Sequence, residues 1–256
     1  MMDLPYRLAT QRAPQIGLIV LQADETLERD MRLLLPSEAE TLVSRVASAA
    51  EVTPDTLAAM EPRLKTAAGL FPTGARFSAI AYGCTSGTAQ IGAARIRTMI
   101  EDVVARADAS PPPVTDPIAA LLAACAHLRL RRIGLISPYI QPVSERLQAV
   151  LQAAGIAIAA FASFNQAQEA AVARIDPQAV LDAACTLHGQ GACEAIFLSC
   201  TNLRTLEILA EAERRTGKPV LSSNQVLGWH LSCLAGLDAP AGAPGRLFER
   251  PGAVRP

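Results

Sequence analysis

The sequence carries no excess of charge of either sign. Its 23 lysine and arginine residues are balanced by 24 aspartate and glutamate residues, which leaves a formal net charge of -1. Without a strong acidic or basic field, the composition does not favour nucleic acid or an anionic lipid surface as a partner. We therefore expect the partner to be a small molecule or another copy of the chain.

The sequence also lacks a long hydrophobic run. The longest apolar stretch, roughly residues 149–162, contains Gln152 and is shorter than the about 20 residues that a membrane-spanning helix needs. The N-terminal residues MMDLPYRLATQRAP have no apolar segment of the kind found in secretory signals. These absences predict a cytoplasmic protein with no membrane helix.

Motifs for metal, nucleotide and serine-nucleophile sites are missing. The six cysteines form no C-x-x-C pair, and Cys185, His188 and Cys193 lack metal-ligand spacing on both sides. No glycine-rich phosphate loop opens a helix, and residues 83–87 read G-C-T-S-G, which differs from the G-x-S-x-G of serine hydrolases. In a cytosolic chain of this length, the cysteines should be free thiols. We expect neither a metal ion nor a cofactor.

The sequence does contain a regular alternation of short apolar runs with Ala- and Leu-rich stretches. Strands are predicted at residues 16–21, 77–83, 132–137, 194–199 and 218–223. Helices are predicted at residues 86–100, 116–128, 143–154, 177–187 and 203–214, where apolar residues recur at intervals of three and four. This alternation is typical of an α/β fold with helices on both faces of parallel sheets.

The chain also contains an internal repeat. The tetrapeptide Ile-Gly-Leu-Ile begins at residues 16 and 133, which are 117 residues apart. The pattern A-I-x-x-x-C-T begins at residues 79 and 195, which are 116 residues apart, and a Pro-Val pair follows each copy at residues 113 and 219. Nearly identical offsets indicate a duplicated half.

The repeat predicts two pseudo-symmetric Rossmann-like lobes, each a parallel sheet flanked by helices. We expect the first lobe to comprise residues 1–115 plus 222–256 and the second residues 116–221. The last strand and helix, residues 220–234, should pack back on the first lobe, and the Pro- and Gly-rich tail from residue 239 should be irregular or an arm on a neighbouring subunit. Open α/β sheets bind ligands at the carboxyl ends of their strands, so the site should lie in a cleft between the lobes.

The candidate catalytic residues are Cys84 and Cys200, which occupy equivalent positions in the two halves. Each follows a strand and should precede a helix whose N-terminus would favour a thiolate and lower its pKa from about 8.5. The neighbours Thr85 and Ser86 in one half, and Thr201 and Asn202 in the other, are natural N-cap residues. The exposed amides of such a helix can also hold a substrate carboxylate.

Two opposed thiols, one ionised and one protonated, would supply the base and the acid that inversion of a carbon centre requires. A thiolate could instead add to a double bond and allow rotation, which gives cis-trans isomerisation. The spacing does not separate these reactions. A single cysteine at a strand end usually only packs, but a pair repeated in register favours catalysis. The remaining thiols, Cys125, Cys185, Cys193 and Cys233, are expected to pack.

The segments YGCTSGT (82–88), SPY (137–139) and LSCTNLRT (198–205) resemble the aspartate/glutamate racemase superfamily, in particular its branch of maleate cis-trans isomerase and arylmalonate decarboxylase. The resemblance covers nearly the whole chain. The segments LQADETLE (21–28) and SSNQVLGWH (222–230) are most similar to the ectoine-utilisation protein A group, whose members are described as racemase-like.

The resemblance implies that Cys84 and Cys200 are the catalytic pair and that Thr85, Ser86 and Tyr139 bind carboxylate oxygens. Asn165 matches a further substrate-binding position of the isomerases, and Thr201 and Asn202 lie beside the second cysteine. The decarboxylase relatives carry glycine at the first cysteine position, so Cys84 argues against decarboxylation. Because the superfamily often forms dimers, we expect a homodimer or a higher homo-oligomer.

One departure from the isomerases concerns the substrate. They carry an asparagine-containing loop where this chain has Gln22, Ala23, Asp24 and Glu25, so Gln22 and Asp24 are expected at the substrate. A carboxylate at Asp24 would repel a dianion such as maleate. Our hypothesis is that Asp24 meets an ammonium group, as in a diaminobutyrate derivative from ectoine breakdown. The alternative is that Asp24 caps the following helix.

The sequence therefore predicts a cofactor-independent racemase or isomerase that acts on a small carboxylate, either amino-acid-like or a dicarboxylate, through two cysteines. A maleate-type cis-trans isomerase or a decarboxylase of the same branch is the first alternative. A non-catalytic binding module is the second, because duplicated α/β lobes also close on small molecules.

Overall fold

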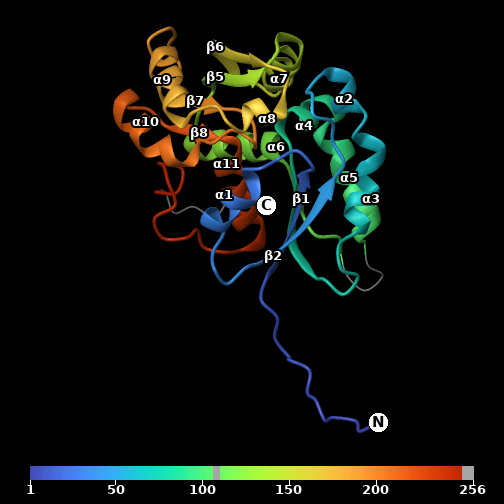
Figure 1. Ribbon diagram of the computed structural model, residues 1–256. Coiled ribbons are helices and arrows are strands. Elements are labelled where there is room, and N and C mark those ends of the chain that lie inside the picture. The colour runs from blue at the N-terminus through green and yellow to red at the C-terminus, as the bar shows by residue number, and fades with distance from the viewer. Residues whose placement is uncertain (106–109, 250–256) are drawn as a thin grey trace.

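The structure is a computed structural model that describes residues 1–105 and 110–249 (Figure 1). It contains two parallel four-stranded sheets flanked by helices. In the first sheet the order is β2-β1-β3-β4, with β1 (Gln15–Leu21), β2 (Glu40–Val46), β3 (Phe77–Gly83) and β4 (Val114–Thr115). In the second the order is β6-β5-β7-β8, with β5 (Arg132–Tyr139), β6 (Ala157–Gln166), β7 (Ala195–Leu198) and β8 (Val220–Ser222). The predicted α/β fold of two similar halves is confirmed.

The helices cover these sheets as an α/β fold requires. Those of the first half are α1 (Leu27–Leu34), α2 (Pro54–Ala58), α3 (Glu61–Gly69), α4 (Thr85–Ile91) and α5 (Ala93–Val104). Those that follow are α6 (Pro117–Leu128), α7 (Gln141–Ala153), α8 (Glu169–Val172), α9 (Pro177–His188), the 3-10 turn η1 (Leu206–Ile208), α10 (Leu209–Thr216) and α11 (Ser223–Ala235).

The sequence repeat corresponds to a repeated topology. The two Ile-Gly-Leu-Ile segments lie on β1 and β5, and the two A-I-x-x-x-C-T segments form β3 and β7 with the turns that follow them. The Pro-Val pairs enter the sheets in the same way, because Ile80 N donates to Pro113 O at 2.9 Å and Ile196 N donates to Pro219 O at 3.0 Å. Each Cys-Thr pair therefore leaves the carboxyl end of an inner strand.

The expected return of residues 220–234 to the first lobe is wrong for the strand. β8 pairs with β7 in the second sheet, through Ile196 opposite Val220. This pairing is the counterpart of β3 with β4, so the repeat itself accounts for it. The following helix, α11, packs against α1, α6 and β3. The proposed residue boundaries of the two lobes stay a prediction.

Several elements differ from the sequence prediction. Strand β2 and helices α1, α2, α3 and α8 were not predicted, and the helix expected over residues 86–100 is divided at Gly92 into α4 and α5. Gly92 has a φ of 98°, which breaks the helix and which glycine adopts without strain. Strand β2 escaped detection because it is an edge strand with mostly exposed side chains.

The hydrophobic core joins the two halves. One buried cluster contains Ile19 of β1, Ile136 of β5 and both candidate cysteines. The other contains Ile16 and Leu18 of β1 together with Leu135 of β5. Alternate residues of a strand point to opposite faces of the sheet, so each face contributes to a core that also takes residues from the other half.

A short tether also connects the halves. Val52 N donates to Ala167 O at 2.7 Å, and Glu169 N donates to Ala50 O at 2.9 Å. Glu51 and Gln168 form an antiparallel bridge between these bonds. The segment that carries α8 is thereby fixed against the first half.

The two ends of the chain differ. Residues 1–9 have no regular structure and run away from the body, as Figure 1 shows. The tail over residues 239–249 is irregular, which is one of the two predicted alternatives, and packs on its own chain through the buried Leu247. Residues 250–256 lie outside the described part. Within the described residues, no helix is both long and apolar enough to cross a membrane.

Candidate active site

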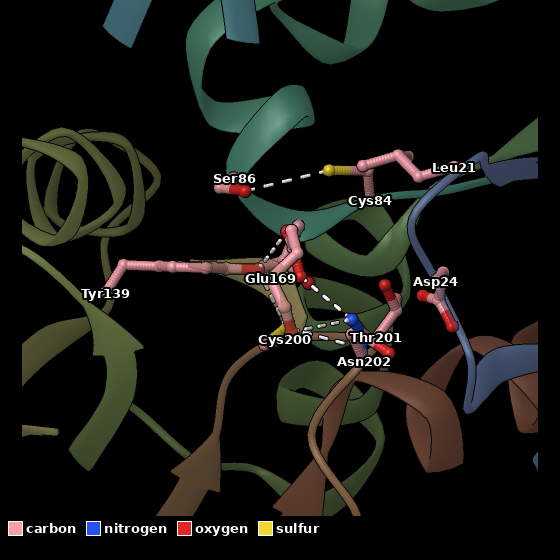
Figure 2. A pocket seen from close by; sticks show the side chains of 10 residues that line it. Leu21, Asp24, Cys84, Ser86, Tyr139, Glu169, Cys200, Thr201 and Asn202 are labelled. Carbon is pink, nitrogen blue, oxygen red and sulfur yellow. Dashed lines mark hydrogen bonds between the residues drawn. The ribbon is translucent and has the colours of Figure 1, made fainter. Parts of the chain in front are cut away.

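A narrow cavity lies at the carboxyl ends of the inner strands of both sheets. The space in it that is not filled by atoms is about 230 Å³, part of which is open to solvent. Its lining residues come from segments far apart in the sequence and are Leu21, Asp24, Cys84, Thr85, Ser86, Tyr139, Glu169, Cys200, Thr201 and Asn202. Figure 2 shows Cys84 and Cys200 on opposite sides of this group of side chains. Besides the two cysteines, seven polar residues line the cavity. Six of them were predicted from the sequence, and one was not.

Cys84 itself caps helix α4. Its Sγ accepts a hydrogen bond from Gly87 N at 3.1 Å and lies 3.6 Å from Ser86 Oγ. The prediction of Thr85 or Ser86 as the cap is therefore wrong by one or two residues. Gly87 is required here, because a Cβ at this position would lie 2.9 Å from Cys84 Sγ.

Cys200 has an unusual backbone conformation, with a φ of 106°. Its N–H donates to Ser223 Oγ at 3.0 Å, and its Sγ accepts from Asn202 N at 3.2 Å and lies 3.0 Å from Tyr139 Oη. The expected helix does not begin here: bends follow Cys200, and η1 starts only at Leu206.

Burial dominates the acidity of both thiols. It raises the pKa of Cys84 to about 12, against the opposing hydrogen bonds from Ser86 and Gly87. It also raises the pKa of Cys200 well above its ordinary value, and the negative charge of Glu169 adds to this rise. The predicted lowering of both pKa values is therefore wrong, because desolvation outweighs the nearby N–H donors.

Three hydroxyl groups connect the two cysteine segments. Ser223 Oγ, besides accepting from Cys200 N, lies 2.8 Å from Thr85 Oγ1. Thr201 Oγ1 donates to Gly83 O at 3.3 Å. The strand end that carries Cys84 and the strand end that carries Cys200 are thus bonded to each other, which fixes the position of one thiol relative to the other.

Glu169 is a cavity residue that was not predicted from the sequence. Its carboxylate accepts hydrogen bonds from Tyr139 Oη at 2.8 Å and from Asn202 Nδ2 at 2.9 Å, as Figure 2 shows. Burial raises the pKa of Glu169. The sequence around it, Q-A-Q-E-A-A, reads as an ordinary helix start. The tether to Ala50 and the bonds from Tyr139 and Asn202 hold this side chain at the cavity.

Asn165 and Gln22 are not brought to the cavity. Both are exposed and absent from its lining within the described residues. Asn165 occupies a left-handed turn position with a φ of 53°, four residues before Glu169. The Gln22 backbone N–H donates to Val46 O at 2.9 Å, which fixes the main chain and leaves the side chain outside.

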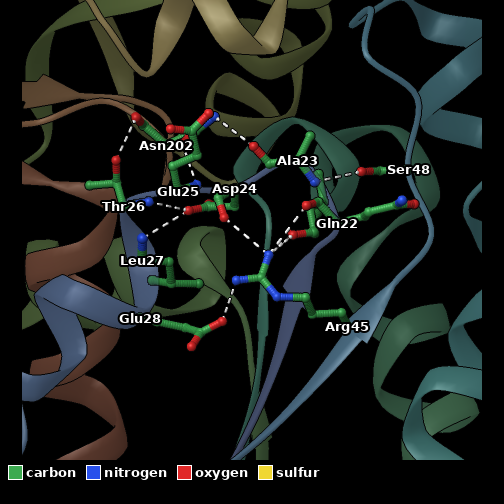
Figure 3. A network of polar contacts seen from close by, with 11 residues as sticks. Gln22, Ala23, Asp24, Glu25, Thr26, Leu27, Glu28, Arg45, Ser48 and Asn202 are labelled. Atoms are coloured by element: carbon green, nitrogen blue, oxygen red, sulfur yellow. Dashed lines mark hydrogen bonds and ion pairs between the residues drawn. The ribbon is translucent and has the colours of Figure 1, made fainter.

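Asp24 has two different carboxylate oxygens (Figure 3). Oδ1 accepts from Thr26 N and Leu27 N, both at 2.8 Å, at the start of α1. Oδ2 is buried and has no hydrogen-bond partner among the described residues. Burial raises the pKa of Asp24, and the bonds from Leu27 and Thr26 oppose that rise. The capping role is therefore present, and one oxygen stays available beside the cavity.

The loop that carries Asp24 is held from both sides. Arg45 of β2 donates to Leu21 O at 2.9 Å and to Asp24 O at 3.1 Å, and it pairs with Glu28. From the other half, Asn202 Oδ1 accepts from Glu25 N at 2.8 Å. Figure 3 shows this network around the loop. Asn202, predicted to bind substrate, thus also holds the loop and contacts Glu169.

Comparison with known proteins places this geometry in a family. The profile described as arylmalonate decarboxylase matches residues 16–248. Maleate isomerase of Nocardia farcinica is 29% identical over 94% of this chain and 97% of its own length. Arylmalonate decarboxylase of Bordetella bronchiseptica is 36% identical over 57% of this chain and 62% of its own.

Solved structures agree. A Nocardia farcinica maleate cis-trans isomerase variant with a covalently bound succinylcysteine intermediate has a TM-score of 0.79 at 25% identity, covering 92% of this chain and 98% of its own. A liganded double variant of arylmalonate decarboxylase has a TM-score of 0.81 at 28% identity, covering 92% of this chain and 99% of its own. The grouping with ectoine-utilisation proteins stays a prediction. The chain belongs to the arylmalonate decarboxylase family, the branch that also contains the maleate isomerases.

Proposed function

We propose that this protein is a cofactor-independent racemase or isomerase of a small carboxylate, with Cys84 and Cys200 as its acid-base pair. The observation that carries the proposal is the placement of the two thiols: they come from equivalent strand ends of the two halves and line one narrow cavity from opposite sides.

Racemisation follows directly from opposed thiols. The thiolate on one face takes the α-proton of the substrate, and the thiol on the other face donates its proton to the carbanion. Each turnover inverts the carbon and exchanges the protonation states of the two sulfurs. We propose that the hydroxyl groups of Thr85 and Ser86, which line the cavity, hold carboxylate oxygens, as the family resemblance implies.

A cis-trans isomerisation at the same thiols is the second candidate. It is favoured by the maleate isomerase relatives, one of which holds a succinylcysteine intermediate. In this route a thiolate adds to the double bond, and rotation follows about the carbon–carbon bond that is now single. Elimination then restores the double bond and regenerates the thiolate. Cys84 stands where the decarboxylase relatives are expected to have glycine, which argues against decarboxylation.

The charge of the cavity favours an amino-acid-like substrate over a plain dicarboxylate. Asp24 and Glu169 both contribute carboxylates, and none of the described lining residues is Lys, Arg or His. A dianion would meet like charges in a poorly solvated space, whereas an ammonium group would neutralise one of them. We assign the buried Oδ2 of Asp24 to this ammonium group. A diaminobutyrate derivative has the required charges.

Proton exchange tests the proposal. The protein is incubated in deuterated water with a panel of amino acids and dicarboxylates, and NMR follows the loss of each α-proton. We expect exchange for at least one amino acid, with inversion, and loss of turnover in Cys84→Ser and in Cys200→Ser. The matched control is Cys185→Ser on α9, outside the cavity.

The outcomes separate the alternatives. Conversion of maleate to fumarate without amino-acid exchange would favour the cis-trans isomerase. Ligand binding that survives both cysteine variants, with no exchange and no conversion, would show a binding module and contradict the catalytic reading.

A further inference from the structure

Three side chains form a continuous hydrogen-bonded chain inside the cavity. Cys200 Sγ lies 3.0 Å from Tyr139 Oη, and Tyr139 Oη donates to Glu169 Oε1 at 2.8 Å. Figure 2 shows these contacts beside the bond from Asn202 Nδ2 to Glu169. All three side chains are buried. A proton on Cys200 therefore has a path to a carboxylate that does not pass through solvent.

The donor and the acceptor in each of these hydrogen bonds follow from the number of protons that each group carries. A tyrosine hydroxyl has one proton to donate, and in this structure Glu169 accepts it. The Tyr139 oxygen is then the acceptor for the S–H of Cys200. The resting arrangement is a thiol, a neutral tyrosine and a carboxylate, joined in that order.

We propose that Glu169 is a positioning residue that takes the Cys200 proton through Tyr139 and so makes Cys200 the thiolate of the pair. The S–H proton passes to Tyr139 Oη while the Tyr139 O–H proton passes to Glu169 Oε1. The products are a Cys200 thiolate, a neutral Tyr139 that now donates to Sγ, and a protonated Glu169. This inference rests on the proposed function, which needs one thiolate, and it names how that thiolate forms.

Proton transfer from Cys200 to Glu169 avoids the cost that burial imposes on ionisation of the thiol. Ionisation by loss of a proton to solvent adds a negative charge to a cavity that already holds Asp24 and Glu169, and burial raises the pKa of both thiols. The relay moves one charge from oxygen to sulfur and leaves the number of charges unchanged. Burial also raises the pKa of Glu169, which makes it a better proton acceptor.

The relay distinguishes the two cysteines. Cys84 Sγ has contacts with Gly87 N and Ser86 Oγ, and neither leads to a carboxylate. Asp24 does not take this part, because the hydrogen bonds of Cys200 Sγ among the described residues run to Tyr139 and Asn202 and not to Asp24. Cys200 is therefore the base at rest, and Cys84 is the thiol that donates the proton.

The test is the pH dependence of Cys200 alkylation by iodoacetamide, read by mass spectrometry of the Cys200 peptide without any substrate. Below the pKa of a simple buried thiol, its alkylation rate rises about tenfold for each unit by which the pH increases, because the thiolate is the reactive form. With the relay, the alkylation rate rises as Glu169 ionises and then stays nearly flat through neutral pH, because thiolate and carboxylate share one proton.

Two variants remove different parts of the chain. We expect Glu169→Gln and Tyr139→Phe each to abolish the flat region and to slow Cys200 alkylation at pH 7 by at least about tenfold. Glu51→Gln is the matched control, since Glu51 is an exposed partner of Gln168 in the same tether and contacts neither thiol. It should retain the wild-type profile.

The contrary result is equally clear. If wild-type Cys200 reacts no faster at neutral pH than Cys200 of both variants, or if only Cys84 shows the flat region, the relay is wrong. Because the experiment uses no substrate, this failure is distinct from failure of the proposed reaction, which the proton-exchange experiment reports separately.

Discussion

At the scale of single residues, the site depends on a strained backbone at Cys200. A φ of 106° is unfavourable for any residue with a Cβ, at a cost on the order of 1 to 3 kcal/mol. The contacts of Ser223 and Asn202 hold this conformation. This conformation places Sγ beside Tyr139, so the position of the thiol requires the strained backbone.

Substitutions at Cys200 should therefore differ in stability according to how readily the new residue adopts a positive φ. We expect Cys200→Gly to be more stable than Cys200→Ala by about 1 kcal/mol, because glycine adopts positive φ without strain. Denaturant unfolding measures the difference. An equal or lower stability of the glycine variant would show that the loop relaxes when the thiol is removed.

Asp24 determines substrate charge in the proposed site. We expect Asp24→Asn to bind plain dicarboxylates such as maleate about tenfold more tightly, because one like charge is removed. The asparagine Oδ1 can still accept from Thr26 and Leu27, so the start of α1 is retained. Calorimetric titration with maleate measures the change, and unchanged affinity would count against a role of Asp24 in the pocket.

At the scale of elements, the first turn of α11 organises the site. Ser222 caps the helix, Ser223 contacts both cysteine segments, and the Asn224 amide donates to Asp30 of α1 and to Thr201 O, each at 2.8 Å. From the sequence, residues 222–224 are assigned to the last strand and helix and to a family resemblance, with no contact to the cysteines. Its role depends on contacts with residues 23 to 194 positions away in the sequence, which periodicity does not reveal.

The burial of Asp30 predicts a pH-dependent stability, although the hydrogen bond from Asn224 opposes the rise in its pKa. Burial raises the pKa of Asp30 from 3.8 to about 6. The folded state thus binds the proton more tightly than the unfolded state, and the free energy of unfolding falls as pH rises through this range. Asp30→Asn should raise that free energy by up to about 3 kcal/mol at neutral pH.

The difference between wild type and Asp30→Asn should vanish below about pH 4, where both side chains are neutral. Urea unfolding at several pH values measures it, with Asp182→Asn on the exposed face of α9 as the control. A difference that does not change with pH would show that packing, and not ionisation, is responsible.

At the scale of the whole molecule, the internal repeat explains why so much was predictable. Two copies of one pattern located both sheets and placed Cys84 and Cys200 at equivalent strand ends. Glu169 was missed because the contacts that hold it at the cavity, with Ala50, Tyr139 and Asn202, join residues at least 30 positions apart in the sequence. The pKa of each thiol was misjudged because the sequence shows a neighbouring helix start but not the depth of burial. The homo-oligomeric state and the cytoplasmic location stay predictions.

The opposed thiols can be observed directly in a crystal structure of the wild-type protein with 2,4-diaminobutyrate. We predict that the α-carbon of the ligand lies between the two sulfurs, about 3.5 Å from each, with its ammonium group at Asp24. A ligand whose α-carbon is reached by only one sulfur, or by both from the same face, would contradict the two-cysteine mechanism.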